Sequence, residues 1–100
     1  MIPTISALEV RKDLPKYLVV DVREPDEFEA GSIPSSINIP LAQFIDNVES
    51  KKFILPPNKE LVLSCRSGNR SGVATQVCMS GGIMAKNLVG GFLAWQKGKQ

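Results

Sequence analysis

The stretch LVLSCRSGNRSGVATQV, residues 61–77, carries an apolar run into a cysteine, a turn containing glycine and arginine, and then a helical pattern. The apolar run predicts a buried strand over residues 60–64, because short runs of this kind are typical of parallel sheets. The pattern after the turn predicts a helix over residues 71–80. Cys65 is therefore expected at the carboxyl end of a strand, where α/β proteins place their ligands.

The segments on either side repeat this alternation of strand and helix. Apolar or β-branched runs predict further strands at residues 17–22, 36–39 and 85–90. Capping residues, prolines and helical periodicity predict helices at residues 6–13, 24–31, 41–48 and 92–98. Strands that alternate with helices favour a parallel sheet covered on both faces. We predict an α/β fold with a central, mostly parallel five-stranded sheet flanked by helices on both faces, and these runs locate four of its strands.

The composition is that of one globular domain over residues 1–100, with 43% hydrophobic residues and a net charge of +2. The lysines are scattered, which disfavours nucleic-acid binding. No apolar run approaches the roughly 20 residues that a membrane helix requires, so no membrane contact is expected. Two cysteines are too few for a disulfide framework or a structural zinc site, which favours a reducing compartment. We expect a cytoplasmic monomer without a metal.

The turn from Cys65 to Arg70 has the features that activate a cysteine. Gly68 permits a positive φ, which turns successive backbone N–H groups inward, and the following helix adds its free N–H groups. Arg66 and Arg70 add positive charge. Such surroundings lower a cysteine pKa from about 8.5 toward neutrality or below. Because the chain contains no histidine, the turn itself must ionise Cys65.

The two cysteines call for different interpretations. Cys65 has a structural alternative as a small buried side chain, but a packing cysteine has no need of an arginine-flanked turn. Cys78 falls on the apolar face of the following helix and is predicted to be a core residue. A redox pair with Cys65 is disfavoured, since two or more helical turns separate Cys78 from the turn and a disulfide needs close Cα atoms.

Charged residues after the strand at 17–22 are candidates for a supporting role. Asp21 ends that strand and is predicted to accept hydrogen bonds from the cysteine turn or to pair with Arg70. Arg23 and Glu27 are four residues apart, a spacing that suits a scaffold salt bridge as well as a catalytic role.

Three segments together resemble the rhodanese domain, the sulfurtransferase module. Residues 19–40, VVDVREPDEFEAGSIPSSINIP, resemble the family's Asp-x-Arg strand end and its Gly-His-Ile-Pro-Gly-Ala segment. Residues 65–71, CRSGNRS, resemble its catalytic loop, and residues 90–95, GGFLAW, its C-terminal signature. The chain departs from the family at Ser32, where histidine is usual, and at Ser35-Ser36, which replace Gly-Ala.

The resemblance implies a ping-pong transfer of sulfur through a persulfide on Cys65, from a donor such as thiosulfate to a thiol or cyanide. It allows a protein as acceptor and requires no cofactor. Asp21 and Arg23 would support the loop. The residues implied in substrate binding are Arg66, Ser67, Gly68, Asn69, Arg70 and Ser71.

Three other functions remain open from the sequence. The first is a non-catalytic rhodanese-like regulatory or binding module, and the second is a sulfur carrier dedicated to one protein partner. The third is a cysteine phosphatase or arsenate reductase. Enzymes of this third class follow Cys-x5-Arg, whereas the residue six positions after Cys65 is Ser71 and the arginine is Arg70. The shorter loop favours a single sulfur atom over a tetrahedral oxyanion.

Overall fold

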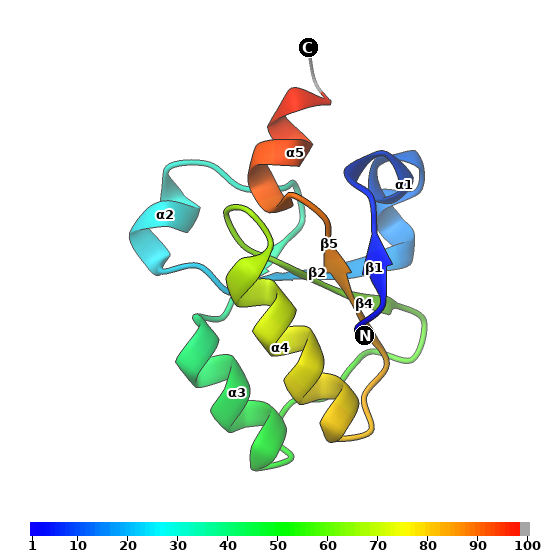
Figure 1. Ribbon diagram of the computed structural model, residues 1–100, viewed down its shortest axis with the longest axis vertical. Helices are drawn as coiled ribbons and strands as arrows, with labels where there is room; N and C mark the ends of the chain where they lie inside the picture. Colours follow the sequence, from blue (N-terminus) through cyan, green and yellow to red (C-terminus); the bar gives the residue numbers. More distant parts are fainter. Residues whose placement is uncertain (99–100) are drawn as a thin grey trace.

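The apolar runs of the chain assemble into one parallel sheet (Figure 1). The computed structural model describes residues 1–98. The strands are β1 (Thr4–Ile5), β2 (Tyr17–Asp21), β3 (Ile37–Asn38), β4 (Glu60–Ser64) and β5 (Ala85–Leu88). They lie in the order β1-β5-β4-β2-β3, and all four neighbouring pairs run parallel. The predicted five-stranded α/β sheet is confirmed, and it is parallel throughout the described residues.

Helices cover both faces of this sheet, as Figure 1 shows, with α3 beside α4 on one side and α1 near α5 on the other. None of the helices within residues 1–98 is long and apolar enough to cross a membrane. The helices are α1 (Ala7–Lys12), α2 (Pro25–Glu29), α3 (Leu41–Glu49), α4 (Asn69–Ser80) and α5 (Gly91–Lys97), with a short 3-10 turn, η1, at Leu14–Lys16.

The central strand β4 divides its side chains between two apolar clusters. Leu61 and Leu63 pack with Phe44 and other residues under α3 and α4, whereas Val62 packs with Trp95 on the opposite face. Successive strand residues point to opposite faces, so a strand covered on both sides favours apolar residues at successive positions. This explains the apolar run from Leu61 to Leu63.

Several boundaries differ from those predicted. The helix predicted from Ser71 begins two residues earlier, at Asn69, because Gly68 adopts a φ of +108° and caps it. The strand predicted over residues 85–90 ends at Leu88, and the glycines at 90 and 91 take φ values of +73° and +56°. The strand predicted at residues 36–39 is reduced to Ile37–Asn38.

The fifth strand, β1, was not located by the sequence prediction. It has only two residues, Thr4 and Ile5, and pairs with Asn87 and Leu88 of β5. Two residues carry no detectable periodicity, so a strand this short is defined by its tertiary contacts. The Ser6 side chain that ends this segment accepts a hydrogen bond from the Glu9 amide, as the predicted helix cap requires.

The turn between α2 and β3 holds Ser35 in an uncommon conformation. The Ser36 amide donates to the Ile33 carbonyl at 3.1 Å, with Pro34 and Ser35 between them. Ser35 has a φ of +68°. A turn with proline second and a positive φ third has the type II pattern, which favours glycine at the third position.

Candidate active site

Cys65 lies immediately after β4, which is flanked by β5 and β2 in the middle of the sheet. Asp21, the last residue of β2, is level with Ser64, so the ends of the two strands meet beside the cysteine. Cys65 is only 1% exposed. The residues that follow it, Arg66 and Ser67, are exposed and lead into Gly68, the cap of α4. The fold therefore presents a buried sulfur beneath a short exposed turn.

Two donors approach the sulfur directly. The Gly68 backbone amide lies 3.1 Å from Cys65 Sγ, and the Ser71 hydroxyl lies 3.3 Å from it. Burial raises the pKa of Cys65, but hydrogen bonds from the Ser71 side chain and from the amides of Ser71, Gly68 and Ser67 outweigh it and lower the pKa overall. The turn therefore favours the thiolate without a histidine.

Arg70 is held by an acidic residue that the sequence prediction did not connect with it. Its two terminal nitrogens donate to the Glu27 carboxylate at 2.7 and 2.9 Å. The hydrogen bond from Arg70 lowers the pKa of Glu27 to about 2, and that bond in turn raises the pKa of Arg70. A bidentate pair fixes the guanidinium in one orientation. Arg70 therefore links the first turn of α4 to α2.

Asp21 and Arg23 form a separate, buried pair, which corrects two predictions. Arg23 Nη2 donates to Asp21 Oδ2 at 2.6 Å, so the partner of Asp21 is Arg23, where Arg70 was the partner considered. Arg23 Nη1 donates to the backbone carbonyl of Glu27 at 3.2 Å. The salt bridge considered between the side chains of Arg23 and Glu27 is therefore replaced by this backbone contact. Arg23 also donates to the Gly31 carbonyl at 2.7 Å. The pair thus braces the α2 segment that carries Glu27.

The first turn of α5 donates backbone hydrogen bonds to the cysteine loop. The Phe92 amide donates to the Cys65 carbonyl at 2.8 Å, and the Leu93 amide donates to the Arg66 carbonyl at 3.2 Å. A Cβ added at Gly91 would lie 2.4 Å from the Cys65 carbonyl oxygen. Residues 90–95 were noticed only as part of a motif, and their contact with the loop depends on tertiary packing that no local pattern reveals.

Asn87 is a further residue of the site that the sequence did not single out. Its side-chain nitrogen donates to the Gly68 carbonyl at 3.1 Å, and its oxygen lies 2.6 Å from the Ser71 hydroxyl. The available signal was an asparagine inside an otherwise strand-like run, since asparagine is depleted in strands.

The remaining predicted residues lie either at the mouth of the site, which is the exposed surface formed by Arg66, Ser67 and Asn69, or in the buried core. Asn69 is exposed beside Arg66 and Ser67, whereas Ser71 is fully buried against the sulfur. Cys78 is fully buried in α4 with a free thiol, and burial raises its pKa to about 11. The prediction that Cys78 is a core residue is confirmed.

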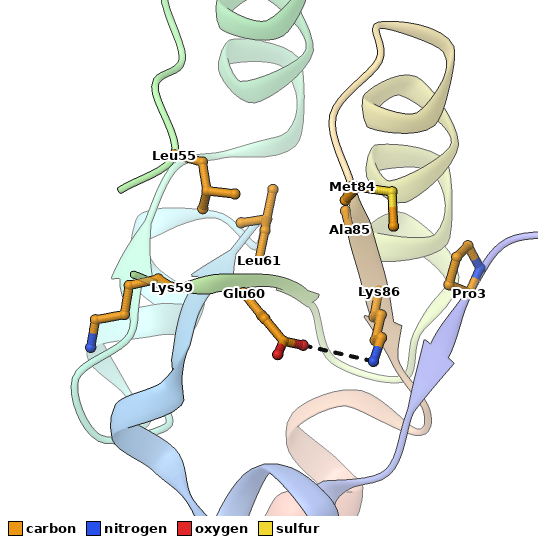
Figure 2. A pocket seen from close by; sticks show the side chains of 8 residues that line it. All are labelled: Pro3, Leu55, Lys59, Glu60, Leu61, Met84, Ala85 and Lys86. Carbon is orange, nitrogen blue, oxygen red and sulfur yellow. Dashed lines mark ion pairs between the residues drawn. The ribbon is translucent and has the colours of Figure 1, made fainter. Parts of the chain in front are cut away.

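A pocket of about 280 Å³ opens at the end of the sheet opposite Cys65, where the strands begin (Figure 2). Glu60 and Ala85, the first residues of β4 and β5, line it, so it lies at the amino ends of these strands and away from Cys65. The other lining residues are Pro3, Leu55, Lys59, Leu61, Met84 and Lys86. Within residues 1–98 no group of three or more acidic, cysteine or histidine side chains is placed to hold a metal.

Known proteins similar to this chain share both its sequence and its fold. It is 40% identical to the thiosulfate:glutathione sulfurtransferase of Saccharomyces cerevisiae, over 84% of the chain and 67% of that protein. It is 42% identical to the adenylyltransferase and sulfurtransferase MOCS3 of Drosophila persimilis, over 79% of the chain. The chain spans only 19% of the length of that second relative.

Solved structures agree with these relatives. The human single-domain sulfurtransferase TSTD1 superposes with a TM-score of 0.81 at 29% identity and covers 97% of both chains. A rhodanese-related protein from Thermoplasma volcanium gives a TM-score of 0.81 at 34% identity, over 96% of this chain and 92% of its own. The sequence model of the rhodanese-like domain matches residues 4–98. The chain therefore belongs to the rhodanese-like domain family.

Proposed function

We propose that the protein is a sulfurtransferase that moves a sulfane sulfur from a donor such as thiosulfate to a thiophilic acceptor through Cys65. The observation that carries this proposal is the approach of the Gly68 amide and the Ser71 hydroxyl to Cys65 Sγ, at 3.1 and 3.3 Å. Donors at this distance stabilise a thiolate, which is the nucleophilic form of cysteine. The sulfurtransferase names of several relatives support the same chemistry.

In the first step, the Cys65 thiolate attacks the outer sulfur of thiosulfate. A new S–S bond forms while the S–S bond of thiosulfate breaks, and sulfite departs with the bonding electron pair. The enzyme is left as a persulfide whose outer sulfur carries the negative charge. The backbone amides of the turn, Gly68 among them, donate to Cys65 Sγ, and in this proposal they also stabilise the charge on the outer sulfur.

In the second step, a nucleophilic acceptor attacks the outer sulfur of the persulfide. With cyanide the product is thiocyanate, and with a thiolate it is an acceptor persulfide; in both reactions Cys65 recovers its electron pair as thiolate. Splitting the transfer into two displacements replaces one difficult exchange by two easier ones. These steps use protein side chains and backbone alone, so we propose no cofactor.

The two arginines of the loop have different roles in this proposal. Arg66 is exposed at the mouth and would attract an anionic donor or acceptor. Arg70, bound to Glu27 at 2.7 Å, would hold the turn in shape. A phosphatase would need the N–H donors of this arginine to bind a phosphate. Both terminal nitrogens of Arg70 donate to Glu27 instead, and this favours sulfur transfer. A protein acceptor would use the same exposed mouth.

Both cysteines are free thiols, which suits a reducing compartment, and we propose that the activity is cytoplasmic.

The test of the proposed activity is the rate of thiocyanate formation from thiosulfate and cyanide. Cys65→Ser should abolish it, since a hydroxyl neither ionises near neutral pH nor carries sulfur. Cys78→Ser, the matched control, should retain most of it. Equal losses in the two folded variants, or no turnover by the unaltered protein with any sulfane donor, would contradict the proposal.

A further inference from the structure

The Ser71 hydroxyl stands between two acceptors. Its oxygen lies 3.3 Å from Cys65 Sγ and 2.6 Å from the side-chain oxygen of Asn87. A serine hydroxyl carries a single proton, so it can donate to only one of these partners at a time. The shorter contact, to Asn87, is the stronger hydrogen bond when the sulfur is uncharged.

The orientation of the Asn87 side chain is fixed by its other contact. One end of the amide lies 3.1 Å from the Gly68 carbonyl, which can only accept a hydrogen bond. The NH2 group must therefore face Gly68, and the amide oxygen must face Ser71. Asn87 consequently accepts from the Ser71 hydroxyl and cannot donate to it.

We propose that Asn87 is a positioning residue that sets the ionisation of Cys65 by competing with the sulfur for the Ser71 proton. When Cys65 is a thiol, its S–H donates to the Ser71 oxygen and the Ser71 proton points to Asn87. When Cys65 is a thiolate, the Ser71 hydroxyl rotates toward the sulfur and the Asn87 oxygen loses its donor. The thiol state thus keeps one hydrogen bond that the thiolate state gives up, and Asn87 opposes ionisation.

The charged groups around Cys65 do not offer the same control. Asp21 and Arg23, at the end of β2, neutralise each other at 2.6 Å, and Arg70 of α4 is paired with Glu27 of α2. Arg66 is exposed to solvent, where its charge is screened. The first turn of α5 contains no acidic residue. The Ser71 hydroxyl is therefore the side-chain donor through which the charge on the sulfur can be regulated.

This inference deepens the proposed function, and it rests on that function for one consequence only. In a persulfide the negative charge lies on the outer sulfur, so Cys65 Sγ becomes a weak acceptor. The Ser71 proton then returns to Asn87, which stabilises the loaded enzyme relative to the free thiolate. Ionisation of Cys65 itself is measured without any sulfur transfer, so its test is independent of the activity.

The experiment is a double-mutant cycle on Asn87→Leu and Ser71→Ala, read as the pKa of Cys65 from the pH dependence of its alkylation by iodoacetamide. Peptide mass spectrometry assigns the alkylation to Cys65. Asn87→Leu should lower the pKa by about half a unit to one unit, the net value of one hydrogen bond. In the Ser71→Ala background, Asn87→Leu should leave the pKa unchanged. Asn38→Leu, which removes another asparagine that donates to backbone carbonyls, is the matched control and should also leave it unchanged.

The cycle separates this role from a purely structural one. If Asn87 only tethers the Gly68 carbonyl, Asn87→Leu shifts the pKa equally in both backgrounds, and that result would overturn the proposal. A raised pKa, no shift at all, or a comparable shift in Asn38→Leu would overturn it too. Thermal unfolding identifies variants that do not fold, and the smaller Asn87→Ala replaces Asn87→Leu in the cycle if the leucine is not accommodated.

Discussion

Gly91 lies against the backbone of Cys65 so closely that a Cβ on Gly91 would sit 2.4 Å from the Cys65 carbonyl oxygen. Its φ is +56°, which side chains rarely adopt. Gly91→Ala should therefore destabilise the protein by about 2 kcal/mol or more and displace the cysteine loop. Chemical denaturation and the sulfurtransferase assay measure the two effects.

Gly82→Ala is the matched control for this prediction. Gly82 also has a positive φ, +81°, but nothing lies within 4 Å of an added Cβ. The Gly82→Ala variant should lose only about 1 kcal/mol of stability, the cost of placing alanine at a positive φ, and it should retain its activity. Equal effects of the two substitutions would show that the contact with Cys65 is unimportant.

Arg66→Ala and Arg70→Ala should differ in their kinetics. Arg66 is exposed at the mouth, so its loss should raise KM for thiosulfate by about threefold to tenfold and leave a neutral organic polysulfide donor unaffected. Arg70 holds Glu27, so its loss should lower kcat for both donors. Steady-state kinetics with the two donors measure this, and identical profiles for the two variants would contradict the assignment.

The Glu27–Arg70 pair should make stability depend on acid pH. The pKa of Glu27 is lowered to about 2 in the folded protein from an ordinary value of 4.5. The stabilisation is therefore complete above pH 4.5 and is lost as the pH falls toward 2. Glu27→Gln should cost about 1 kcal/mol at pH 7, because the pair is partly exposed and screened, and almost nothing near pH 2. Urea unfolding at the two pH values tests this, and a pH-independent difference would contradict it.

Ser35→Gly should stabilise the protein. Ser35 occupies the third position of its turn with a φ of +68°, a conformation that glycine adopts without strain. The expected gain is up to about 1 kcal/mol, reduced by the greater flexibility of glycine in the unfolded chain. The midpoint of thermal unfolding should rise accordingly, whereas a lower midpoint would show that the Ser35 side chain makes a contact that outweighs the strain.

The site could be predicted where it depends on local sequence, and was missed where it depends on distant contacts. The apolar run before Cys65 predicted a buried strand, and Gly68 predicted a turn with a positive φ, because both features act within a few residues. Asn87 and Gly91 reach the loop only after β5 and α5 have packed beside it. No pattern within 10 residues of Cys65 reports those contacts.

The charged residues illustrate the same limit. The sequence drew attention to all four residues of the two ion pairs, but the pairing itself depends on the tertiary fold: Arg23 pairs with Asp21, and Arg70 pairs with Glu27. Arg23 is two residues from Asp21 and turns back onto it, whereas Arg70 meets Glu27 across 43 residues of sequence. Residue type and spacing in the sequence therefore identify which residues form ion pairs, whereas the tertiary fold determines which of them pair with each other.

The mass of the intact protein after incubation with thiosulfate and desalting tests the central claim most directly. The unaltered protein and Cys78→Ser should each gain the mass of one sulfur atom, located on Cys65 by peptide mapping and removed by cyanide. Cys65→Ser should gain nothing. A sulfur atom on Cys78, a gain in mass by Cys65→Ser, or sulfur transfer by a protein that never carries the added atom would contradict a persulfide on Cys65.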